Sequence, residues 1–503
     1  MAIAPQPNLG SSSESAPLPD PQPGRSAGVR SVLVEKLFFG NEPTPELIAI
    51  LLVYLVQGIL GLARLAVSFF LKDELHLSPA EVAALMGVVA IPWMIKPLFG
   101  FMSDGFPIFG YRRRPYLILS GIGGALAWVA MATVVHTGWA AMLAIALSSL
   151  SVAVSDVIAD SLVVERARGE STGTAGSLQS LCWGVSALGG LLTAYLSGVL
   201  LEQFSAQTVF WMTSMFPLLV CFGAFAIRET PLAARPDLSV IRQQASDLWQ
   251  AVSQKAIWLP TLFLFLWQAT PSSDTAFFYF TTNELQFPPE FLGRVRLVTS
   301  VAALIGVWAF QRFFKNVPFR KIFLWSTLAS TALGMTTLLL VTHANRALGI
   351  DDRWFSLGDS LILTVAGQIT FMPVLVLSAR LCPPGVEATL FALLMSVYNL
   401  AGAVSSEFGA LLTHWLGVDE THFDRLWLLV TIANLSTLLP LPLVGWLPMG
   451  NESESVANPE DLPPEVTMVK HREPNMVPTF MPEMSPQPDR RDRSYPKPAK
   501  SAE

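Results

Sequence analysis

Residues 100–115, GFMSDGFPIFGYRRRP, form a short polar stretch between two long apolar runs. The stretch ends in three consecutive arginines, Arg112, Arg113 and Arg114, and Asp104 stands a few residues before them. In a soluble protein this would be an ordinary charged surface loop. Here the flanking runs are apolar enough to lie in lipid, so the stretch predicts a turn at the cytoplasmic surface of a membrane.

The composition of the whole chain also indicates a polytopic membrane protein. Of its 503 residues, 52% are hydrophobic and only 14% are charged, whereas soluble domains carry about 25% charged residues. The three cysteines, Cys182, Cys221 and Cys382, fall in or beside apolar runs without metal-ligand spacing, and we interpret them as small core residues. We expect no metal, no cofactor and no nucleic-acid partner.

Twelve apolar runs are long enough to cross a bilayer, because a hydrocarbon core of about 30 Å needs roughly 20 residues of helix. They cover residues 46–71, 79–101, 115–135, 138–164, 174–201, 207–227, 256–282, 291–313, 321–342, 356–380, 389–416 and 425–447. The sequence therefore predicts an all-α membrane protein with about twelve transmembrane helices. Residues 1–45 and 448–503 lack apolar periodicity and are predicted to be disordered tails.

Basic residues in the connecting loops predict the orientation, since cytoplasmic loops are enriched in Lys and Arg. The side of the hairpin carries Arg112, Arg113, Arg114, Arg166, Arg168, Arg228, Arg235, Arg242, Lys255, Arg312, Lys315, Arg320, Lys321 and Arg380. The other side carries Lys72, Arg346, Arg353 and Arg425, mostly beside acids. The hairpin side is therefore predicted to be cytoplasmic, and an even number of spans places both tails there too.

The longest internal connection, residues 228–255, divides the predicted spans into two six-helix halves, residues 46–227 and 256–447. The halves resemble each other weakly, since LVVERAR at 162–168 closes span four and LVLSAR at 375–380 closes span ten. Two such repeats describe the major facilitator architecture. The opening hairpin agrees, because its Gly, Asp, Gly and arginine pattern resembles the loop between helices two and three of that superfamily.

Five segments carry a closer resemblance. They are PWMIKPLFGFMSDGFPIFGYRRRPY (92–116), SDVIADSLVVERAR (155–168), GSLQSLCWG (176–184), WQATPSSDTAFFYFTTNEL (267–285) and CPPGVEATLFALLMSVYNL (382–400). In this order they resemble the folate–biopterin transporter family, from about Leu37 to Trp446. The resemblance implies a carrier of folates or pterins, most often proton-coupled. Members of the family occur in cyanobacteria, plant plastids and some protozoa. The acidic residues of the N-terminal tail favour a cyanobacterial-type inner membrane, with the chloroplast envelope as the alternative, because plastid transit peptides are poor in acids.

Ionisable residues inside the spans are informative, because each costs about 2.5–3.5 kcal/mol at mid-helix and so tends to face a cavity or a partner. Asp156 and Asp160 are four residues apart and share one face of their helix. Two carboxylates this close favour retention of a proton on one of them. We predict proton-coupling roles for Asp156, Asp160 and Glu407. The alternative is that each aspartate pairs with a basic group such as Lys96 or Arg166 and only holds helices together.

The chemistry of the implied ligand suggests which residues bind it. A pterin edge presents adjacent N–H donors to a carboxylate, its ring stacks on aromatic side chains, and the glutamate carboxylates of a folate need Arg or Lys. The predicted substrate-binding residues are Arg64, Lys96, Asp156, Gln179, Trp183, Gln268, Asp274, Phe278, Arg294 and Arg296. Segment 268–278 is the strongest candidate, because Pro271 breaks its helix. For each polar group, hydrogen bonding between helices is the structural alternative.

The charged residues on the predicted cytoplasmic face are interpreted as an inner gate. The set is Gly100, Asp104, Arg112, Arg113, Arg114, Arg166, Arg168, Arg380 and Glu387. Ion pairs among them would hold the halves together when the carrier faces outward and break when it faces inward. The alternative is that the three consecutive arginines serve only topology.

Three functions are consistent with a chain of this kind to different degrees. The first is a proton-coupled importer of folates or pterins, working as a monomer in the lipid bilayer. The second is an exporter, or a carrier of another flat anionic metabolite. The third is a membrane-embedded enzyme or pigment-binding protein, which would need a fixed constellation of ligating or catalytic side chains. The six histidines lie in loops, near span ends or in a tail, so we expect a carrier and not an enzyme.

Overall fold

The computed structural model describes residues 41–167, 172–231, 248–314, 316–382 and 387–448, together with Val34, Phe38 and Ser246. Most of both predicted tails, and most of the connection at 228–255, therefore lie outside the described residues. The chain divides into two units, residues 1–456 and 457–503. The helices from α2 to η5 all belong to the first unit.

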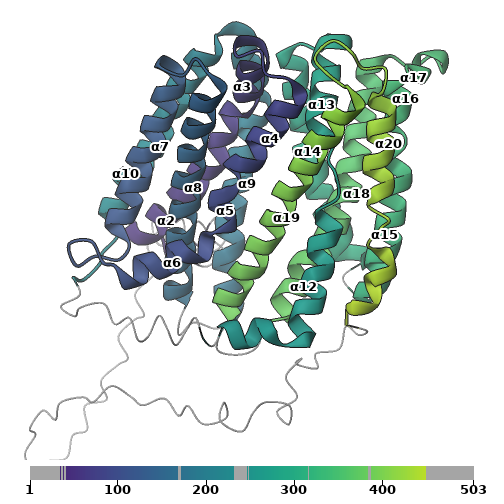
Figure 1. Cartoon of the computed structure of the whole chain (residues 1–503). Helices are drawn as coiled ribbons and strands as arrows, with labels where there is room; N and C mark the ends of the chain where they lie inside the picture. Colours follow the sequence, from purple (N-terminus) through teal and green to yellow (C-terminus); the bar gives the residue numbers. More distant parts are fainter. Residues whose placement is uncertain are drawn as a thin grey trace, which may run out of the picture. The chain divides into compact units, whose positions relative to one another are not determined.

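The first six predicted spans consist of helices that stand side by side (Figure 1). Span one contains α2 (Pro45–Ile59), η1 (Leu60–Leu62), α3 (Ala63–Phe69) and η2 (Phe70–Glu74). Span two contains α4 (Pro79–Val89), α5 (Ile91–Met94) and α6 (Lys96–Gly105). Spans three to six are α7 (Arg114–Thr133), α8 (Gly138–Ala167), α9 (Thr172–Gln203) and α10 (Ala206–Ala226).

Spans seven to twelve also consist of helices. Span seven contains α12 (Lys255–Gln268), α13 (Asp274–Tyr279) and η3 (Phe280–Glu284). Span eight contains α14 (Pro289–Ala309) and η4 (Phe310–Phe314), and span nine contains α15 (Phe319–Gly334) and α16 (Thr337–Val341). After the short α17 (Ala344–Ala347) come α18 (Asp352–Arg380), α19 (Glu387–Leu416), α20 (Leu426–Ser436) and η5 (Leu441–Trp446).

The predicted all-α membrane fold is confirmed. Eleven of the described helical segments are long and apolar enough to cross a membrane. The predicted span at 256–282 is not among these eleven, because its helix is divided into two shorter ones. Helix α12 ends at Gln268 and α13 begins at Asp274. This interruption surrounds Pro271, where the sequence predicts a break.

Exposed tryptophans gather near the helix ends. We call the end that carries the loop between α6 and α7 the hairpin end, and the other the opposite end. Near the opposite end lie Trp139, Trp211, Trp354, Trp415 and Trp427, and near the hairpin end lie Trp258, Trp308 and Trp325. Tryptophan prefers the two membrane–water interfaces. These positions therefore agree with helices that cross a bilayer from one end to the other.

Spans one and seven finish in the same unusual turn at the opposite end. Both end in a π-helical segment, η2 and η3. Each segment is followed by a residue with positive φ, His76 at 52° and Gln286 at 52°. The backbone hydrogen bonds also correspond, since Leu75 N–H reaches Phe70 O and Leu285 N–H reaches Phe280 O. A shared pattern, Phe-x3-Glu-Leu-x3-Pro, underlies the two turns at residues 70–79 and 280–289.

Helices α9 and α14 approach each other through glycine, and they belong to spans five and eight. A Cβ added at Gly198 would lie 2.4 Å from the carbonyl oxygen of Pro289 and 2.8 Å from Cα of Gly293. Because both neighbours are backbone atoms, they cannot give way without moving a helix. Helices α4 and α19 form a second contact between the first six and the last six spans.

Substitution of Gly198 by alanine is expected to separate α9 from α14. The cost of such overpacking is about 1–3 kcal/mol, so Gly198→Ala should lower the melting temperature in detergent and reduce transport. Gly184→Ala is the matched control, because the added Cβ meets nothing within 4 Å on the same helix. Equal melting temperatures for the two variants would show that the close approach is unimportant.

Candidate functional site

Four side chains from spans one, two and four form a charge cluster inside the helices. The Lys96 ammonium forms an ion pair with Asp156, and the Tyr54 hydroxyl donates a hydrogen bond to Asp160. Only 17% of the Lys96 side chain and 12% of the Asp156 side chain are exposed. The structure thus brings together three predicted site residues, and it adds Tyr54, which is 4% exposed.

Local helix geometry positions this charge cluster. Asp156 and Asp160 lie one turn apart on α8, so both face α2 and α6. Span two is interrupted at Ile95, whose φ of −104° and ψ of 16° are not helical, and Lys96 is the first residue of α6. The Lys96 ammonium also lies 4.9 Å from the centre of the Trp93 ring. One ammonium thus faces two carboxylates, so one carboxylate can take up a proton while the other still balances Lys96.

Two arginines from spans one and eight form a second group, the arginine pair. Arg296 Nη1 donates to the carbonyl oxygen of Gly61 at 3.1 Å and to Ser197 Oγ at 2.9 Å. Gly61 lies in η1, the 3-10 turn that interrupts the α-helix of span one. Arg64 lies near enough to act electrostatically on Arg296. Among the described residues, no carboxylate forms an ion pair with either guanidinium.

The structure separates Arg294 from Arg296, although the sequence suggests the same role for both. Arg294 forms an ion pair at 2.6 Å with Glu290, one turn earlier on α14, and its side chain is 58% exposed. Two residues of helix turn the chain by about 200°. The two arginines therefore point to different sides of α14, and only Arg296 faces Arg64.

The interrupted span seven rests on α19. Ser405 Oγ donates to the carbonyl oxygen of Thr270, and the Ser272 N–H donates to the carbonyl oxygen of Ser405 at 3.2 Å. A Cβ at Gly409 would lie 2.1 Å from Ser272 O, so glycine permits this close contact. Backbone groups freed by the break are thus satisfied by α19, as membrane helices require.

The predicted residues in span seven have different surroundings. Gln268 Oε1 accepts a hydrogen bond from Tyr398 at 2.8 Å. Asp274 is exposed at the first residue of α13. Phe278 packs edge-on against Phe69 with 5.5 Å between ring centres, which makes it part of a contact between spans one and seven.

Three further predicted residues lie apart from these groups. Trp183 is 61% exposed on α9. Glu407 lies against span two, since a Cβ at Gly87 would lie 2.3 Å from Glu407 Oε1. Within the described part of the chain, Glu407 has no ion-pair or hydrogen-bond partner. The Gln179 side chain lies outside the described residues.

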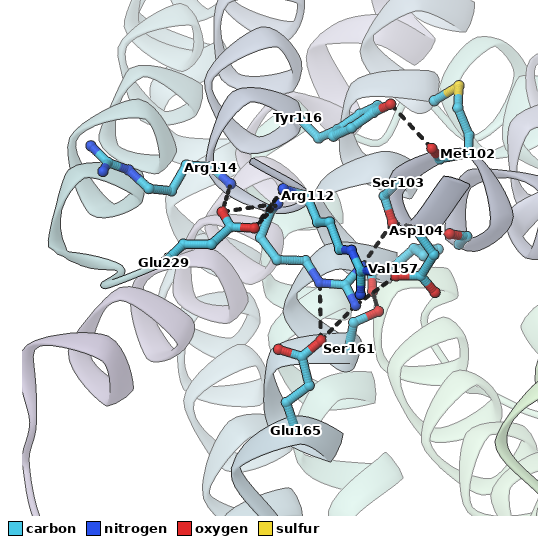
Figure 2. A network of polar contacts seen from close by, with 12 residues as sticks. Met102, Ser103, Asp104, Arg112, Arg114, Tyr116, Val157, Ser161, Glu165 and Glu229 are labelled. Carbon is cyan, nitrogen blue, oxygen red and sulfur yellow. Dashed lines mark hydrogen bonds and ion pairs between the residues drawn. The ribbon is translucent and has the colours of Figure 1, made fainter. Parts of the chain in front are cut away.

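At the hairpin end, Arg113 is the centre of a polar network. It is 6% exposed and pairs with Asp104 at 2.9 Å and with Glu165 at 2.6 Å. Arg113 Nη1 also donates to Ser103 Oγ at 2.8 Å. Figure 2 shows Ser103, Asp104 and Glu165 converging on this point from α6 and α8. These partners all come from the first six spans.

Glu229 holds the backbone of the consecutive arginines. Its carboxylate accepts the N–H groups of Arg112, Arg113 and Arg114 (Figure 2). It therefore fixes the first turn of α7 to the segment after α10. This contact satisfies backbone donors that a helix N-terminus leaves free.

The other predicted gate residues have local contacts. Arg166 donates to Thr44 Oγ1 at 2.7 Å and to the carbonyl oxygen of Glu42, which ties α8 to the start of α2. The Arg380 guanidinium lies 5.3 Å from the centre of the Phe319 ring. Gly100 faces Val157, since a Cβ added at Gly100 would lie 3.7 Å from Val157 Cγ1. Arg168 and the Glu387 side chain lie outside the described residues.

Polar contacts also join spans one and seven at the opposite end. Lys72 Nζ donates to Asn283 Oδ1 at 2.8 Å, and the Tyr279 hydroxyl donates to the carbonyl oxygen of Leu77. Asn283 Nδ2 reaches the carbonyl oxygen of Glu420 at 2.8 Å, in the loop before α20. The turns at residues 70–79 and 280–289 therefore take part in a contact between the first six and the last six spans.

The loop that receives Asn283 is organised by Asp419. Its carboxylate accepts the N–H groups of Thr421 and His422 at 2.8 Å each. The bond from the Thr421 N–H, the largest cause, lowers the pKa of Asp419. The hydrogen bond to the Asp419 carboxylate in turn raises the pKa of the exposed His422 imidazole.

Several contact residues were not predicted from the sequence. Tyr54 carries no sequence signal, because a tyrosine in an apolar run is more often a packing residue. Glu229 follows span six and belongs to no motif or spacing that would mark it as a contact residue. Lys72 and Asn283 could have been found from the sequence, because each lies within a copy of the repeated pattern Phe-x3-Glu-Leu-x3-Pro. Among the described residues, no group of three or more His, Cys, Asp or Glu side chains could hold a metal ion.

A family model and individual known proteins both relate this chain to folate–biopterin transporters. The BT1 family model matches residues 57–465. A folate-biopterin transporter of Synechocystis sp. is 60% identical over 476 residues, covering 92% of this chain and 96% of that protein. Folate transporter 2 of Plasmodium falciparum is 32% identical over 413 residues, covering 82% of this chain and 90% of that protein.

Solved structures share the fold at low sequence identity. The nucleoside transporter NupG matches with a TM-score of 0.58 and 13% identity, covering 80% of this chain and 98% of that structure. A D-xylose–proton symporter matches with a TM-score of 0.59 and 13% identity, covering 82% of this chain and 98% of that structure. At this identity the likeness concerns the arrangement of helices alone.

Proposed function

The chain belongs to the BT1 family, the folate–biopterin transporters, and from this premise we propose that it carries folates or pterins across a membrane by alternating access, coupled to protons. It is a multi-pass membrane protein, and its relatives are transporters rather than enzymes. The close Synechocystis relative supports a bacterial inner membrane as its location. We further propose that it acts as a monomer.

The arginine pair is the observation that carries this proposal furthest. Two guanidinium groups inside membrane spans are costly without anions, and the described residues supply none for Arg64 and Arg296. The glutamate carboxylates of a folate would provide the missing charge through charge-assisted hydrogen bonds. Gln268, Asp274 and Trp183 remain the candidates for contact with the pterin ring.

The charge cluster supports proton coupling. Asp156 and Asp160 share one ammonium, Lys96, and a proton taken up by one carboxylate would leave the other to balance Lys96. Binding and loss of that proton would then make or weaken the contacts between spans one, two and four. Glu407, between spans two and eleven, is a second candidate for the same role.

Alternating access would use the contacts at the two ends of the helices. The opposite end is joined across the two proposed six-helix halves by Lys72 with Asn283 and by Tyr279 with Leu77. These bonds would have to break for a ligand to enter from that side. The repeated turns at 70–79 and 280–289 support a two-halved chain. At the hairpin end, proposed to be cytoplasmic, the Arg113 network lies within the first six spans, so Glu387 remains the candidate for a gate contact between the halves.

Uptake of labelled folate tests the proposal. Cells that cannot make folate should accumulate it above the outside concentration when they express this protein, and a protonophore should abolish that accumulation. The control is the same strain with an empty vector. Uptake that is unchanged by the protonophore would contradict only the proposed proton coupling. Absence of uptake of folate and of every pterin would contradict the proposed substrate.

A further inference from the structure

The hairpin between α6 and α7 has an unusual residue at its tip. Ile108 and Tyr111 exchange two backbone hydrogen bonds of 3.0 Å each, so Phe109 and Gly110 form a two-residue turn. Their φ angles are 54° and 84°. Turns with positive φ at both positions favour Asn-Gly or Gly-Gly. Phenylalanine is therefore a poor choice for the backbone here, and strain of this kind points to a role for the side chain.

The side chain of Phe109 has almost no contact with its own chain. It is 90% exposed, and Phe106, before the turn, is 57% exposed. Figure 1 shows the loop between α6 and α7 extending sideways beyond the end of α10. The loop that carries Phe109 thus lies beside the helices at the level of their ends, where a bilayer has its headgroup region.

The base of the hairpin is held rigidly. Tyr116 donates its hydroxyl to the carbonyl oxygens of Phe106 at 2.7 Å and Met102 at 3.2 Å. Glu229 fixes the backbone after the turn. These hydrogen bonds therefore fix the position of the turn that carries Phe109.

A basic group accompanies the aromatic tip. The Arg114 guanidinium lies 5.6 Å from the centre of the Tyr111 ring and 5.8 Å from that of Phe225. Phe225 is 63% exposed near the end of α10. Figure 2 shows the Arg114 guanidinium directed away from Glu229. No carboxylate of the described residues forms an ion pair with it.

We infer that this hairpin is a lipid anchor. Phe109 enters the boundary between headgroups and acyl chains, and Arg114 binds the phosphate of an anionic phospholipid. An aromatic ring that is exposed at interface depth and a cation that rests on neighbouring aromatic rings are the features such a site requires. The inference does not depend on the transported substrate.

A fluorescent label at the tip tests the anchor. The full-length protein, with its three native cysteines replaced, is labelled at Phe109→Cys with an environment-sensitive dye. It is then placed in vesicles of phosphatidylcholine and phosphatidylglycerol that contain headgroup-nitroxide lipid. Phe225→Cys, at an exposed position on α10, is the lipid-facing reference, and His422→Cys, in an exposed loop of the opposite end, is the aqueous reference.

Quenching by the nitroxide lipid is expected to be close to that at position 225 and several-fold stronger than at position 422. Quenching by iodide as strong as at position 422, with little quenching by lipid, would overturn the anchor. That result would also be found if the tip served a soluble partner. Lipid quenching at position 109 should weaken in phosphatidylcholine alone, and Arg114→Gln should remove this difference between the two vesicles. Equal quenching in both vesicles before that substitution would overturn the assignment of Arg114 to an anionic headgroup.

A second variant separates anchoring from folding. Phe109→Gly suits a positive φ, so its melting temperature in detergent should equal or exceed that of the parent protein. Addition of phosphatidylglycerol should raise the melting temperature of the parent more than that of Phe109→Gly. An equal rise in the two proteins would count against the anchor.

Discussion

Asp156→Asn is expected to abolish concentrative folate uptake and to lower the amount of folded protein in the membrane. The substitution leaves Lys96, only 17% exposed, without its ion-pair partner. Removing one partner of a buried pair costs up to about 3–5 kcal/mol, and Asp160 offsets part of this cost because it also acts electrostatically on Lys96. Both quantities are measured in the same cells, uptake with labelled folate and folded protein by fluorescence-detected gel filtration.

The double variant Lys96→Met with Asp156→Asn distinguishes a structural pair from a coupling pair. Replacing both charges removes the unpaired ammonium, and such replacements are often neutral for stability. Folded protein should therefore return towards the parent level. If the pair couples transport to protons, accumulation should remain absent, while exchange of labelled for unlabelled folate down its gradient continues. Normal accumulation by the double variant would show that the pair only holds helices together.

Arg296→Gln is expected to reduce folate uptake at least about tenfold. A hydrogen bond to a charged group contributes about 1.5–3 kcal/mol, and about 1.4 kcal/mol corresponds to a factor of ten. Arg294→Gln, two residues away, is the matched control. Its exposed pair with Glu290 is screened by solvent and contributes little, so uptake should stay close to that of the parent.

The choice of ligand sharpens this comparison. A pterin that lacks glutamate has no carboxylate for the arginine pair, so its uptake should fall less in Arg296→Gln than folate uptake does. The amount of each variant in the membrane is measured in the same cells, because a folding defect would reduce the uptake of folate and of pterin equally. Equal losses for folate and pterin, or equal losses in the two arginine variants, would contradict a carboxylate site at Arg64 and Arg296.

The site was only partly predictable from the sequence. Spacing placed Asp156 and Asp160 on one helical face, and Pro271 marked the interruption of span seven. The sequence left open whether Asp156 pairs with Lys96 or stands free, and the structure has that pair. It also grouped Arg294 with Arg296, although only the latter faces Arg64. Glu387 and Gln179 stay predictions.

The sequence by itself determined the membrane class, the helical fold and the family. These depend on hydrophobicity summed over whole spans and on motifs read in order, which no single contact can reverse. Tertiary structure alone decided which charges meet. Tyr54 reaches Asp160 across 106 residues, and Glu229 reaches Arg112 across 117. Such partners are chosen by the rotation and depth of packed helices, and small changes in either leave the hydropathy pattern unaltered.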